Sequence, residues 1–230
     1  MKSLFITGTD TDVGKTVISA GLSRAISNQG VNIGVMKPFA AAELQSSSEF
    51  QSEDTEILAK AARVSDPEEL LNPQFFPIPA SPYTASKTLD MKVDLEKVLE
   101  KFDELKKLHD MILVEGMGGI MTPILENYFV ADLIRDMGLE TIIVIRSKIG
   151  TVNHTMLTNK ICDDYKIPVK GIIINNFDSE GYPVQELKRD IEQLTGNKVL
   201  GVIPKLESFD ANDVATILSK EINIPELLEN

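Results

Sequence analysis

The residues most able to do chemistry lie near the N-terminus, where the sequence reads Gly8-Thr9-Asp10-Thr11-Asp12-Val13-Gly14-Lys15-Thr16. Glycines let backbone N–H groups converge on phosphate oxygens, and a helix that begins at such a loop adds partial positive charge. A lysine followed by a threonine brings an ammonium group to the β- and γ-phosphates and a hydroxyl to Mg²⁺. The usual loop has four residues between its glycines, whereas Thr9 stands at the expected first glycine here and Gly8 lies one residue earlier. The segment still predicts binding of a nucleoside triphosphate with Mg²⁺.

Two further charged residues stand at the ends of apolar runs. Lys37 follows residues 33–36, and Glu115 follows residues 111–114. In open α/β sheets the ligand site lies outside the carboxyl ends of the strands, so both side chains are expected beside the phosphate loop. A lysine at a strand end can also be merely solvated. Glu115 is an expected metal ligand, and Asp54 is either a second one or a favourable charge in a first helical turn.

Later polar residues suggest further contacts. Residues 146–155 contain a glycine and free N–H groups that suit a carboxylate or another anion. His154 in this segment is expected to pack or cap locally, because nothing metal-like or nucleophilic surrounds it. Asn175 and Asn176 end another apolar run. Their amides are expected either to hydrogen-bond a nucleotide base or to form a turn. Cys162 has no motif around it and is expected to be a structural thiol.

An alternation of strand and helix must position these residues. Nearly continuous apolar runs predict strands covered on both faces, and amphipathic stretches between them predict helices. The expected strands are residues 4–6, 33–36, 111–114, 142–145, 172–174 and 199–203, and expected helices include 18–26, 57–62, 95–105 and 153–165. This order predicts a doubly wound, mostly parallel α/β sheet flanked by helices, of the P-loop NTPase type, in one domain spanning residues 1–230.

Two stretches interrupt this rhythm. Residues 40–52 contain three consecutive serines and are expected to form a flexible loop. Residues 72–88 carry four prolines, which argue against a helix or a central strand through most of the segment.

Composition excludes several classes of partner. The 23 basic and 35 acidic residues give a net charge of -12, which opposes broad attraction to nucleic acid or to an anionic membrane surface. The sequence has no apolar run long enough to span a bilayer, no signal-like start and a single cysteine. A cytoplasmic setting without nucleic acid or membrane partners is therefore expected.

Taken in order, the motifs closely resemble those of the dethiobiotin synthetase family. They are the loop at residues 8–16, Met36-Lys37-Pro38, Ser81-Pro82, Val114-Glu115-Gly116 with Gly118-Gly119, Gly150-Thr151 with Asn153-His154-Thr155, and Gly201 with Pro204. The match runs from Ile6 to about Leu206 and includes the unusual loop spacing. Such a series in preserved order is much more specific than any one motif.

The resemblance implies an ATP- and Mg²⁺-dependent closure of 7,8-diaminopelargonate with CO₂ to dethiobiotin, carried out by a homodimer. It also implies residue roles. Lys37, Lys15 and Thr11 would be catalytic, and Thr16, Asp54 and Glu115 would bind the metal. The nucleotide would contact Thr9, Asp12, Val13, Gly14, Lys15, Thr16, Val17, Asn175 and Pro204. The substrate would contact Thr11, Lys37, Ala41, Gly118, Gly150, Val152 and Asn153, with residues 150–153 coming from the other subunit.

The sequence departs from the family pattern at two positions and leaves two other functions to weigh. Ala41 stands where a substrate-contacting serine is usual, and Met117 stands where a small alanine is common. A nucleotide-dependent switch of the partition type would share the loop and sheet but needs no Lys37 motif. An amidotransferase-type ligase would need a further glutaminase domain with a nucleophilic cysteine, for which this chain has neither length nor residue.

Overall fold

The computed structural model describes residues 3–42, 50–177 and 182–228. In this part of the chain, six parallel strands form the central sheet, in the order β10-β9-β8-β1-β5-β2. Their runs of valine, isoleucine and leucine suit a sheet that is covered on both faces. The strands are β1 (Leu4–Gly8), β2 (Ile33–Met36), β5 (Met111–Glu115), β8 (Glu140–Arg146), β9 (Val169–Phe177) and β10 (Val199–Pro204), so the predicted sheet is confirmed.

The strand register brings distant residues to one edge of the sheet. Ile6 pairs with Glu115 across β1 and β5, and Met36 pairs with Val114 across β2 and β5. The residues that follow these three strands therefore leave the sheet at the same carboxyl edge. This edge holds the candidate site.

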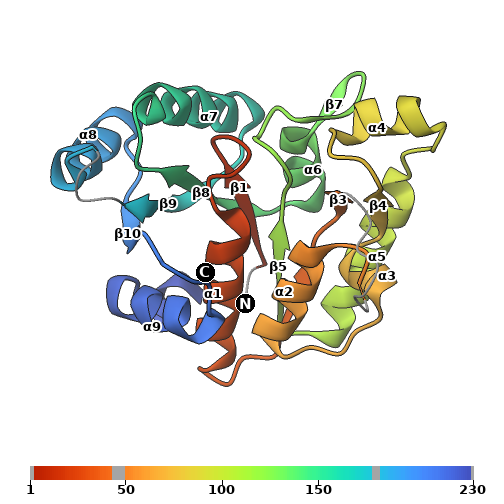
Figure 1. Ribbon diagram of the computed structural model, residues 1–230, viewed down its shortest axis with the longest axis horizontal. Helices are drawn as coiled ribbons and strands as arrows, with labels where there is room; N and C mark the ends of the chain where they lie inside the picture. The colour runs from red at the N-terminus through yellow and green to blue at the C-terminus, as the bar shows by residue number, and fades with distance from the viewer. Residues whose placement is uncertain (1–2, 43–49, 178–181, 229–230) are drawn as a thin grey trace.

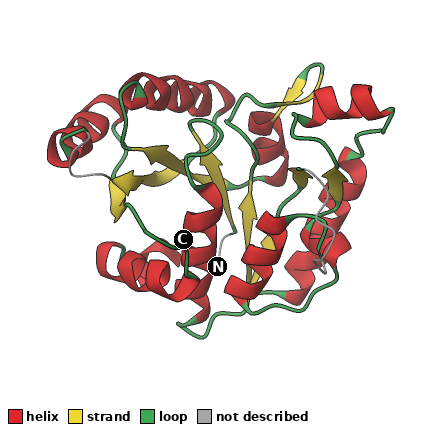
Figure 2. Ribbon diagram, viewed as in Figure 1, coloured by secondary structure: helices red, strands yellow, loops and turns green. Residues whose placement is uncertain are grey.

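Helices cover both faces of the sheet, as Figures 1 and 2 show. The first helix packs against two others on one face, and a second group lies above β9 and β10 in Figure 1. The first group is α1 (Lys15–Ser27), α2 (Glu53–Ala62) and α9 (Ala211–Glu221), and the second includes α7 (Thr151–Tyr165) and α8 (Val184–Thr195). The remaining helices are α3 (Glu68–Leu71), α4 (Pro82–Leu89), α5 (Leu95–Leu108), α6 (Val130–Met137) and α10 (Ile224–Leu228).

The two stretches expected to be irregular contain regular structure. β3 (Phe39–Ala41) pairs in parallel with β4 (Gln74–Phe76) in a small sheet apart from the central one. The expected flexible loop is thus wrong for residues 40–41, while residues 43–49 lie outside the described residues. The expectation of no helix or central strand through most of residues 72–88 is confirmed, since β4 lies outside the central sheet and α4 begins only at Pro82, whose missing N–H costs nothing in a first turn. A second small sheet pairs β6 (Pro123–Leu125) with β7 (Tyr128–Phe129).

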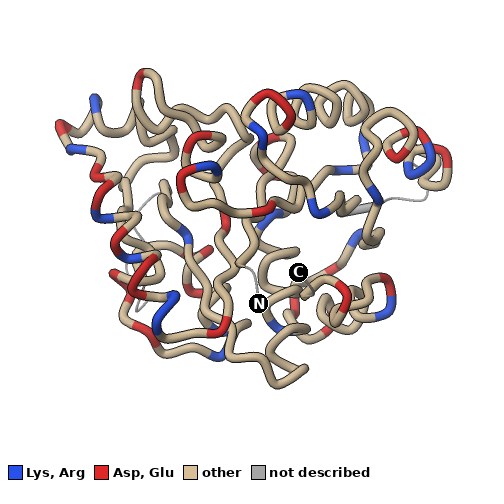
Figure 3. Tube along the Cα trace, turned by 180° about the vertical axis from the view of Figure 1, so that it is seen from behind, with Lys and Arg blue, Asp and Glu red and all other residues tan. Residues whose placement is uncertain are grey.

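Residues of opposite charge are interspersed along the outer helices (Figure 3), whereas Lys15, Lys37, Glu115 and Asp132 are buried. Viewed from behind, Lys and Arg positions alternate with Asp and Glu positions along the outer helices (Figure 3). Within the described ranges, no helix is both long and apolar enough to cross a membrane.

Candidate active site

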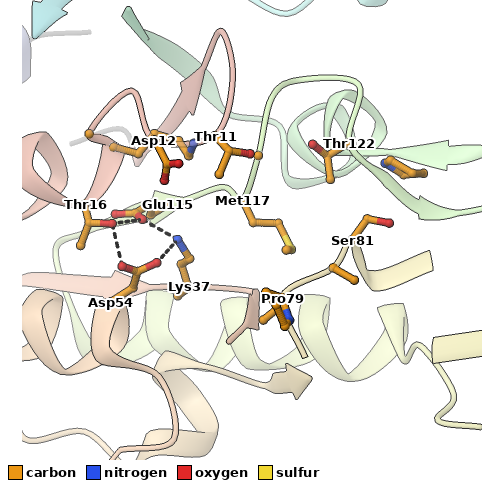
Figure 4. Close-up of a pocket in the computed structure, with 16 residues that line it drawn as sticks. Thr11, Asp12, Thr16, Lys37, Asp54, Pro79, Ser81, Glu115, Met117 and Thr122 are labelled. Atoms are coloured by element: carbon orange, nitrogen blue, oxygen red, sulfur yellow. Dashed lines mark hydrogen bonds and ion pairs between the residues drawn. The ribbon is translucent and has the colours of Figure 1, made fainter. Parts of the chain in front are cut away.

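A cavity of about 700 Å³ opens at the carboxyl edge of β1, β2 and β5. Figure 4 shows a charged cluster at one end and mostly uncharged side chains toward the other. The lining residues come from the phosphate loop and the start of α1, from the ends of β2, β3 and β5, from α2, and from the segments that lead into α4 and β6. They are Thr11, Asp12, Gly14, Lys15, Thr16, Lys37, Ala41, Asp54, Pro79, Ala80, Ser81, Glu115, Met117, Gly118, Thr122 and Pro123.

The phosphate loop ends at Gly14, whose backbone is in the left-handed conformation, and α1 begins at the next residue. Gly14 has φ 89° and caps α1 without a side chain, so the N–H groups of the first helical turn face the cavity edge. A Cβ built on Gly14 would lie 2.0 Å from the amide nitrogen of Asn175, so the position admits only glycine. Lys15 bends back over the loop, and its ammonium donates a hydrogen bond to the carbonyl oxygen of Asp10 at 3.0 Å. These groups together form a cradle for an anion.

Burial and the nearby charge of Lys37 lower the pKa of Lys15 to about 8. Two ammonium groups thus share one cavity, and their mutual repulsion is relieved by a multiply charged anion between them. A triphosphate is such an anion.

Lys37 lies at the centre of the charged cluster. Its Nζ is 2.5 Å from Oε1 of Glu115 and 2.8 Å from Oδ2 of Asp54. The hydroxyl of Thr16 lies 2.9 Å from Oδ1 of Asp54 and 2.9 Å from Oε1 of Glu115, so its one hydrogen serves one carboxylate at a time. The structure therefore joins four residues from α1, α2 and the ends of β2 and β5, as Figure 4 shows.

The charges around Lys37 and Asp54 keep these two groups ionised. Burial alone would lower the pKa of Lys37, but the carboxylates of Glu115 and Asp54 outweigh it and raise that pKa above the ordinary value. Burial alone would raise the pKa of Asp54, but the charge of Lys37 and the hydrogen bonds to Lys37 and Thr16 lower it. Lys37 is thus a cation at neutral pH.

The donor atoms of the cluster fit a magnesium ion. Mg²⁺ prefers hard oxygen ligands and binds through one or two carboxylates together with water and phosphate oxygens. Asp54, Glu115 and Thr16 supply two carboxylates and a hydroxyl, and Oε2 of Glu115 is buried without a hydrogen-bond partner. In the described part of the chain no group of three or more His, Cys, Asp or Glu side chains could hold a metal. A cation here would complete its coordination with a ligand's oxygens.

The opposite end of the cavity contains residues that the sequence did not single out for this role. Met117 points into the cavity, and Pro79 and Ala80 add apolar surface. Ser81 caps α4, and the hydroxyl of Thr122 accepts a hydrogen bond from the N–H of Gly119 at 2.9 Å. Ser81 belonged to one of the recognised motifs. Thr122 carried only the weak signal of following the glycines at positions 118 and 119.

Ten of the predicted site residues line the cavity, and the others lie elsewhere. Val13 is buried, and Asn175 donates a hydrogen bond to its carbonyl oxygen at 2.9 Å. Thr9 borders a second cavity of about 640 Å³ against α7. Val17 belongs to α1, Pro204 ends β10, and Gly150, Val152 and Asn153 form the start of α7. The individual roles of all these residues stay predictions.

Neither histidine lines this cavity. His154 borders the second cavity, and His109 ends α5, where its ring contacts Asn32 and Asp66 at 2.8 and 3.0 Å. Cys162 is buried, and burial raises the pKa of its thiol to about 12. This agrees with a structural thiol.

Comparison with known proteins identifies relatives over the whole chain. The AAA domain family model matches residues 2–213. ATP-dependent dethiobiotin synthetase BioD of Nitrosopumilus maritimus is 58% identical over 229 residues, which cover 100% of both chains. The protein of the same name from Bacillus licheniformis is 39% identical, with 97% of this chain and 94% of that one covered, and that from Bacillus subtilis is 37% identical, with 99% and 98% covered.

Solved structures with the same fold are more distant. The MinD cell division protein of Aquifex aeolicus matches with a TM-score of 0.60 at 17% identity, covering 100% of this chain and 98% of that one. A ParA family ATPase from Chlorobium tepidum matches with a TM-score of 0.55 at 17% identity, covering 99% and 93%. At such identities the likeness shows a shared fold alone.

Proposed function

The chain belongs to the ATP-dependent dethiobiotin synthetase family and is an ATP-dependent ligase, and from this premise we propose that its cavity closes 7,8-diaminopelargonate with CO₂ to form dethiobiotin, ADP and phosphate. One observation carries the assignment of the site. The ammonium groups of Lys15 and Lys37 line the same cavity as the oxygen donors Thr16, Asp54 and Glu115. We assign the reaction to a single domain spanning residues 1–230.

The phosphate loop would hold the triphosphate. The N–H groups that follow Gly14 and the ammonium of Lys15 would bind phosphate oxygens. Thr16, Asp54 and Glu115 would hold Mg²⁺, which neutralises charge on the β- and γ-phosphates when bound. The nucleotide would thus lie with its γ-phosphate toward the charged cluster.

The reaction would proceed in three steps. One substrate amine forms an N–C bond to CO₂ and loses a proton, which gives a carbamate. A carbamate oxygen forms a bond to the γ-phosphorus while the bond to ADP breaks. The second amine then attacks the carbonyl carbon and loses a proton, and the C–O bond to phosphate breaks as the ring closes.

The chain's own residues would act on the charge that moves along this path. Lys37 remains protonated, so its ammonium can neutralise both the carbamate and the transferred phosphoryl group. The hydroxyl of Thr11 would hold substrate or phosphate oxygens. Met117 and Pro79 form an apolar wall suited to the hydrocarbon part of the substrate. Holding the second amine against the activated carbonyl adds an effective concentration of up to ~10⁵ to 10⁸ M.

A second copy of the chain would complete the site. Ile149 is 94% exposed, and Leu157 and Met121, which both border the second cavity beside the phosphate loop, are 60% and 39% exposed. Ile149 precedes α7 in the chain and Leu157 belongs to it, and apolar groups so exposed favour contact with another protein surface. We assign the surface around the start of α7 to the homodimer, in which residues 150–153 of one subunit would approach the substrate bound to the other.

Measurement of ATP hydrolysis and product formation tests this function. We expect 7,8-diaminopelargonate with bicarbonate to stimulate ATP turnover strongly and to yield one dethiobiotin for each ADP formed. A chelator that removes Mg²⁺ should abolish turnover. A switch of the partition type would hydrolyse ATP at a rate indifferent to the diamino acid, and this result would contradict the proposal.

A further inference from the structure

The side chain of Asn72 holds the main chain of Lys37. Asn72 lies between α3 and β4 and is only 6% exposed. Its amide nitrogen donates hydrogen bonds to the carbonyl oxygens of Lys37 at 2.6 Å and of Gln74 at 3.2 Å. The backbone N–H of Lys37 donates in turn to the carbonyl oxygen of Leu71 at 2.6 Å. The segment 71–74 therefore holds both polar backbone groups of Lys37.

The central sheet does not supply these contacts. The pairing of β2 with β5 ends at Met36, so Lys37 lies just beyond the ladder. Pro38 follows and has no N–H to donate, and a residue before proline is confined to extended conformations. In an apolar interior an unpaired carbonyl is costly, so the hydrogen bond from the amide of Asn72 stabilises the observed position of the Lys37 main chain.

The position of this main chain sets the position of the ammonium group. The side chain of Lys37 is 4% exposed and reaches Glu115 and Asp54 at 2.5 and 2.8 Å. A reacting group that is misplaced by about 1 Å can cost roughly 10²-fold in rate. Among the described residues that line the cavity Asn72 is not found, so it would act without touching a ligand.

We propose that Asn72 is a positioning residue for ring closure, which acts by clamping the main chain of Lys37 from segment 71–74. This inference rests on the catalytic role proposed above for Lys37. It predicts that loss of the Asn72 amide lowers the rate of the chemical steps and leaves ATP binding at the phosphate loop unchanged.

A double-mutant cycle tests the proposal. The variants are Asn72→Ala, Lys37→Ala and the combination of both. Asn197→Ala is the matched control. The amide of Asn197 donates two hydrogen bonds of similar length, to Asn159 at 2.6 Å and to the carbonyl of Thr195 at 3.3 Å, and Asn197 follows α8 and does not line the cavity. Steady-state kcat for dethiobiotin formation and the Kd for ATP are measured for each.

We expect Asn72→Ala to lower kcat by roughly 10- to 10²-fold with the Kd for ATP changed less than about twofold. In the Lys37→Ala background the same substitution should cause no further loss, because Asn72 acts through Lys37. Asn197→Ala should retain the wild-type kcat. The proposal is overturned if Asn72→Ala matches Asn197→Ala, if its loss adds in full to that of Lys37→Ala, or if Lys37→Ala itself leaves kcat unchanged.

Amide hydrogen exchange measures how firmly the main chain of Lys37 is held, independently of the reaction. The N–H of Lys37 should exchange faster in Asn72→Ala than in wild type or Asn197→Ala, and equal exchange would refute the clamp. If wild-type enzyme makes no dethiobiotin while exchange still rises, the proposed function fails and the clamp stands. If Asn72→Ala does not fold, Asn72→Asp replaces it, because aspartate has nearly the same shape as asparagine. In its protonated form the new carboxyl can donate one hydrogen bond to the carbonyl of Lys37, whereas the carboxylate cannot. The activity of Asn72→Asp relative to wild type should therefore rise as the pH is lowered. A pH-independent ratio would count against the clamp.

Discussion

The ammonium nitrogen of Lys37 lies 2.5 Å from Oε1 of Glu115, although 78 residues separate the two in the chain. The parallel pairing of β2 and β5 causes this contact, because both strands end at the same edge of the sheet. One carboxylate thus contacts the lysine and the hydroxyl of Thr16 through the same oxygen. The proposed metal site and the proposed catalytic cation are therefore coupled.

Lys37→Ala should lower turnover by roughly 10² to 10³-fold, because the charge that neutralises the transferred phosphoryl group is lost. Removing one member of a buried ion pair also lowers the free energy of unfolding by about 3 to 5 kcal/mol. The assay temperature should therefore lie well below the unfolding temperature of the variant. Lys106→Ala, which removes a half-exposed lysine from α5, is the control. A turnover equal to that control would remove Lys37 from the mechanism.

Glu115→Gln should weaken magnesium binding. The amide keeps the shape of the side chain but loses the negative charge that a divalent cation prefers, so the Mg²⁺ concentration for half-maximal turnover should rise at least about tenfold. Glu104→Gln on α5 changes an exposed carboxylate that pairs with Lys101 and serves as the control. An identical Mg²⁺ dependence in both variants would place the metal elsewhere.

Gly14→Ala should abolish measurable ATP binding. Its Cβ would enter the space of the Asn175 amide at 2.0 Å, in addition to the strain of φ 89°. Gly30 is the matched control, because it has φ 81° with nothing within 4 Å of a built Cβ. Gly30→Ala should lose only about 1 to 2 kcal/mol of stability and bind ATP normally. Calorimetric titration with ATP distinguishes the two, and normal binding by Gly14→Ala would contradict the described loop.

Proton uptake should accompany ATP binding above neutral pH. Burial and the charge of Lys37 lower the pKa of Lys15 to about 8, and phosphate oxygens beside its ammonium would raise that pKa again. Between about pH 8 and pH 9 the bound form should therefore hold more protons than the free form, and the affinity for ATP should fall as the pH rises. Calorimetry in buffers of different ionisation enthalpy measures this uptake. If ATP binding to Lys15→Met takes up the same number of protons, the proton uptake belongs to a group other than Lys15.

The same pKa shift affects stability. Between about pH 8 and the ordinary lysine pKa of 10.5, the unfolded chain holds a proton on Lys15 that the folded chain has lost. Unfolding then takes up protons, so this residue makes the free energy of unfolding rise with pH in that range. The difference between wild type and Lys15→Met in denaturant titrations should show this slope.

Leu157→Lys should dissociate the proposed dimer. Leu157 is 60% exposed beside the second cavity, and a charge there would have to be desolvated on association. Leu194 on α8 is 52% exposed outside the proposed interface, so Leu194→Lys should leave the dimer intact. Sedimentation should show a dimer for wild type and Leu194→Lys and a monomer for Leu157→Lys at micromolar concentration. A monomeric wild type would reject the interface.

The strands, the main helices and the phosphate loop were predictable because their signals are local. Apolar runs of four to six residues, helical periodicity and the order Gly14-Lys15-Thr16 can each be read within one short window. The helix at the end of the proline-rich segment has a local cause too. Pro82 in the first turn is compatible with α4, and the other three prolines of residues 72–88 precede that helix.

The composition of the site was only partly predictable. Strand ends identified Lys37 and Glu115, because parallel strands must end at a common edge. Met117 and Thr122 carried little signal, since a side chain enters a cavity only after the surrounding segments have packed. The hydrogen bond from Asn72 to the carbonyl of Lys37 carried no signal in the sequence, because the two residues lie 35 positions apart in the chain.

The sequence by itself thus determined the chemistry of this protein: a phosphate loop, a lysine after the second strand and a glutamate at the end of β5, in the order typical of dethiobiotin synthetases. The tertiary structure decided the strand order, the joining of Lys37, Asp54, Glu115 and Thr16 into one cluster, and the side chains that hold this cluster in place. The physical reason is that residue type and local spacing are set along the chain, whereas distances of 2.5 to 3 Å between remote side chains arise only when the helices pack on the sheet.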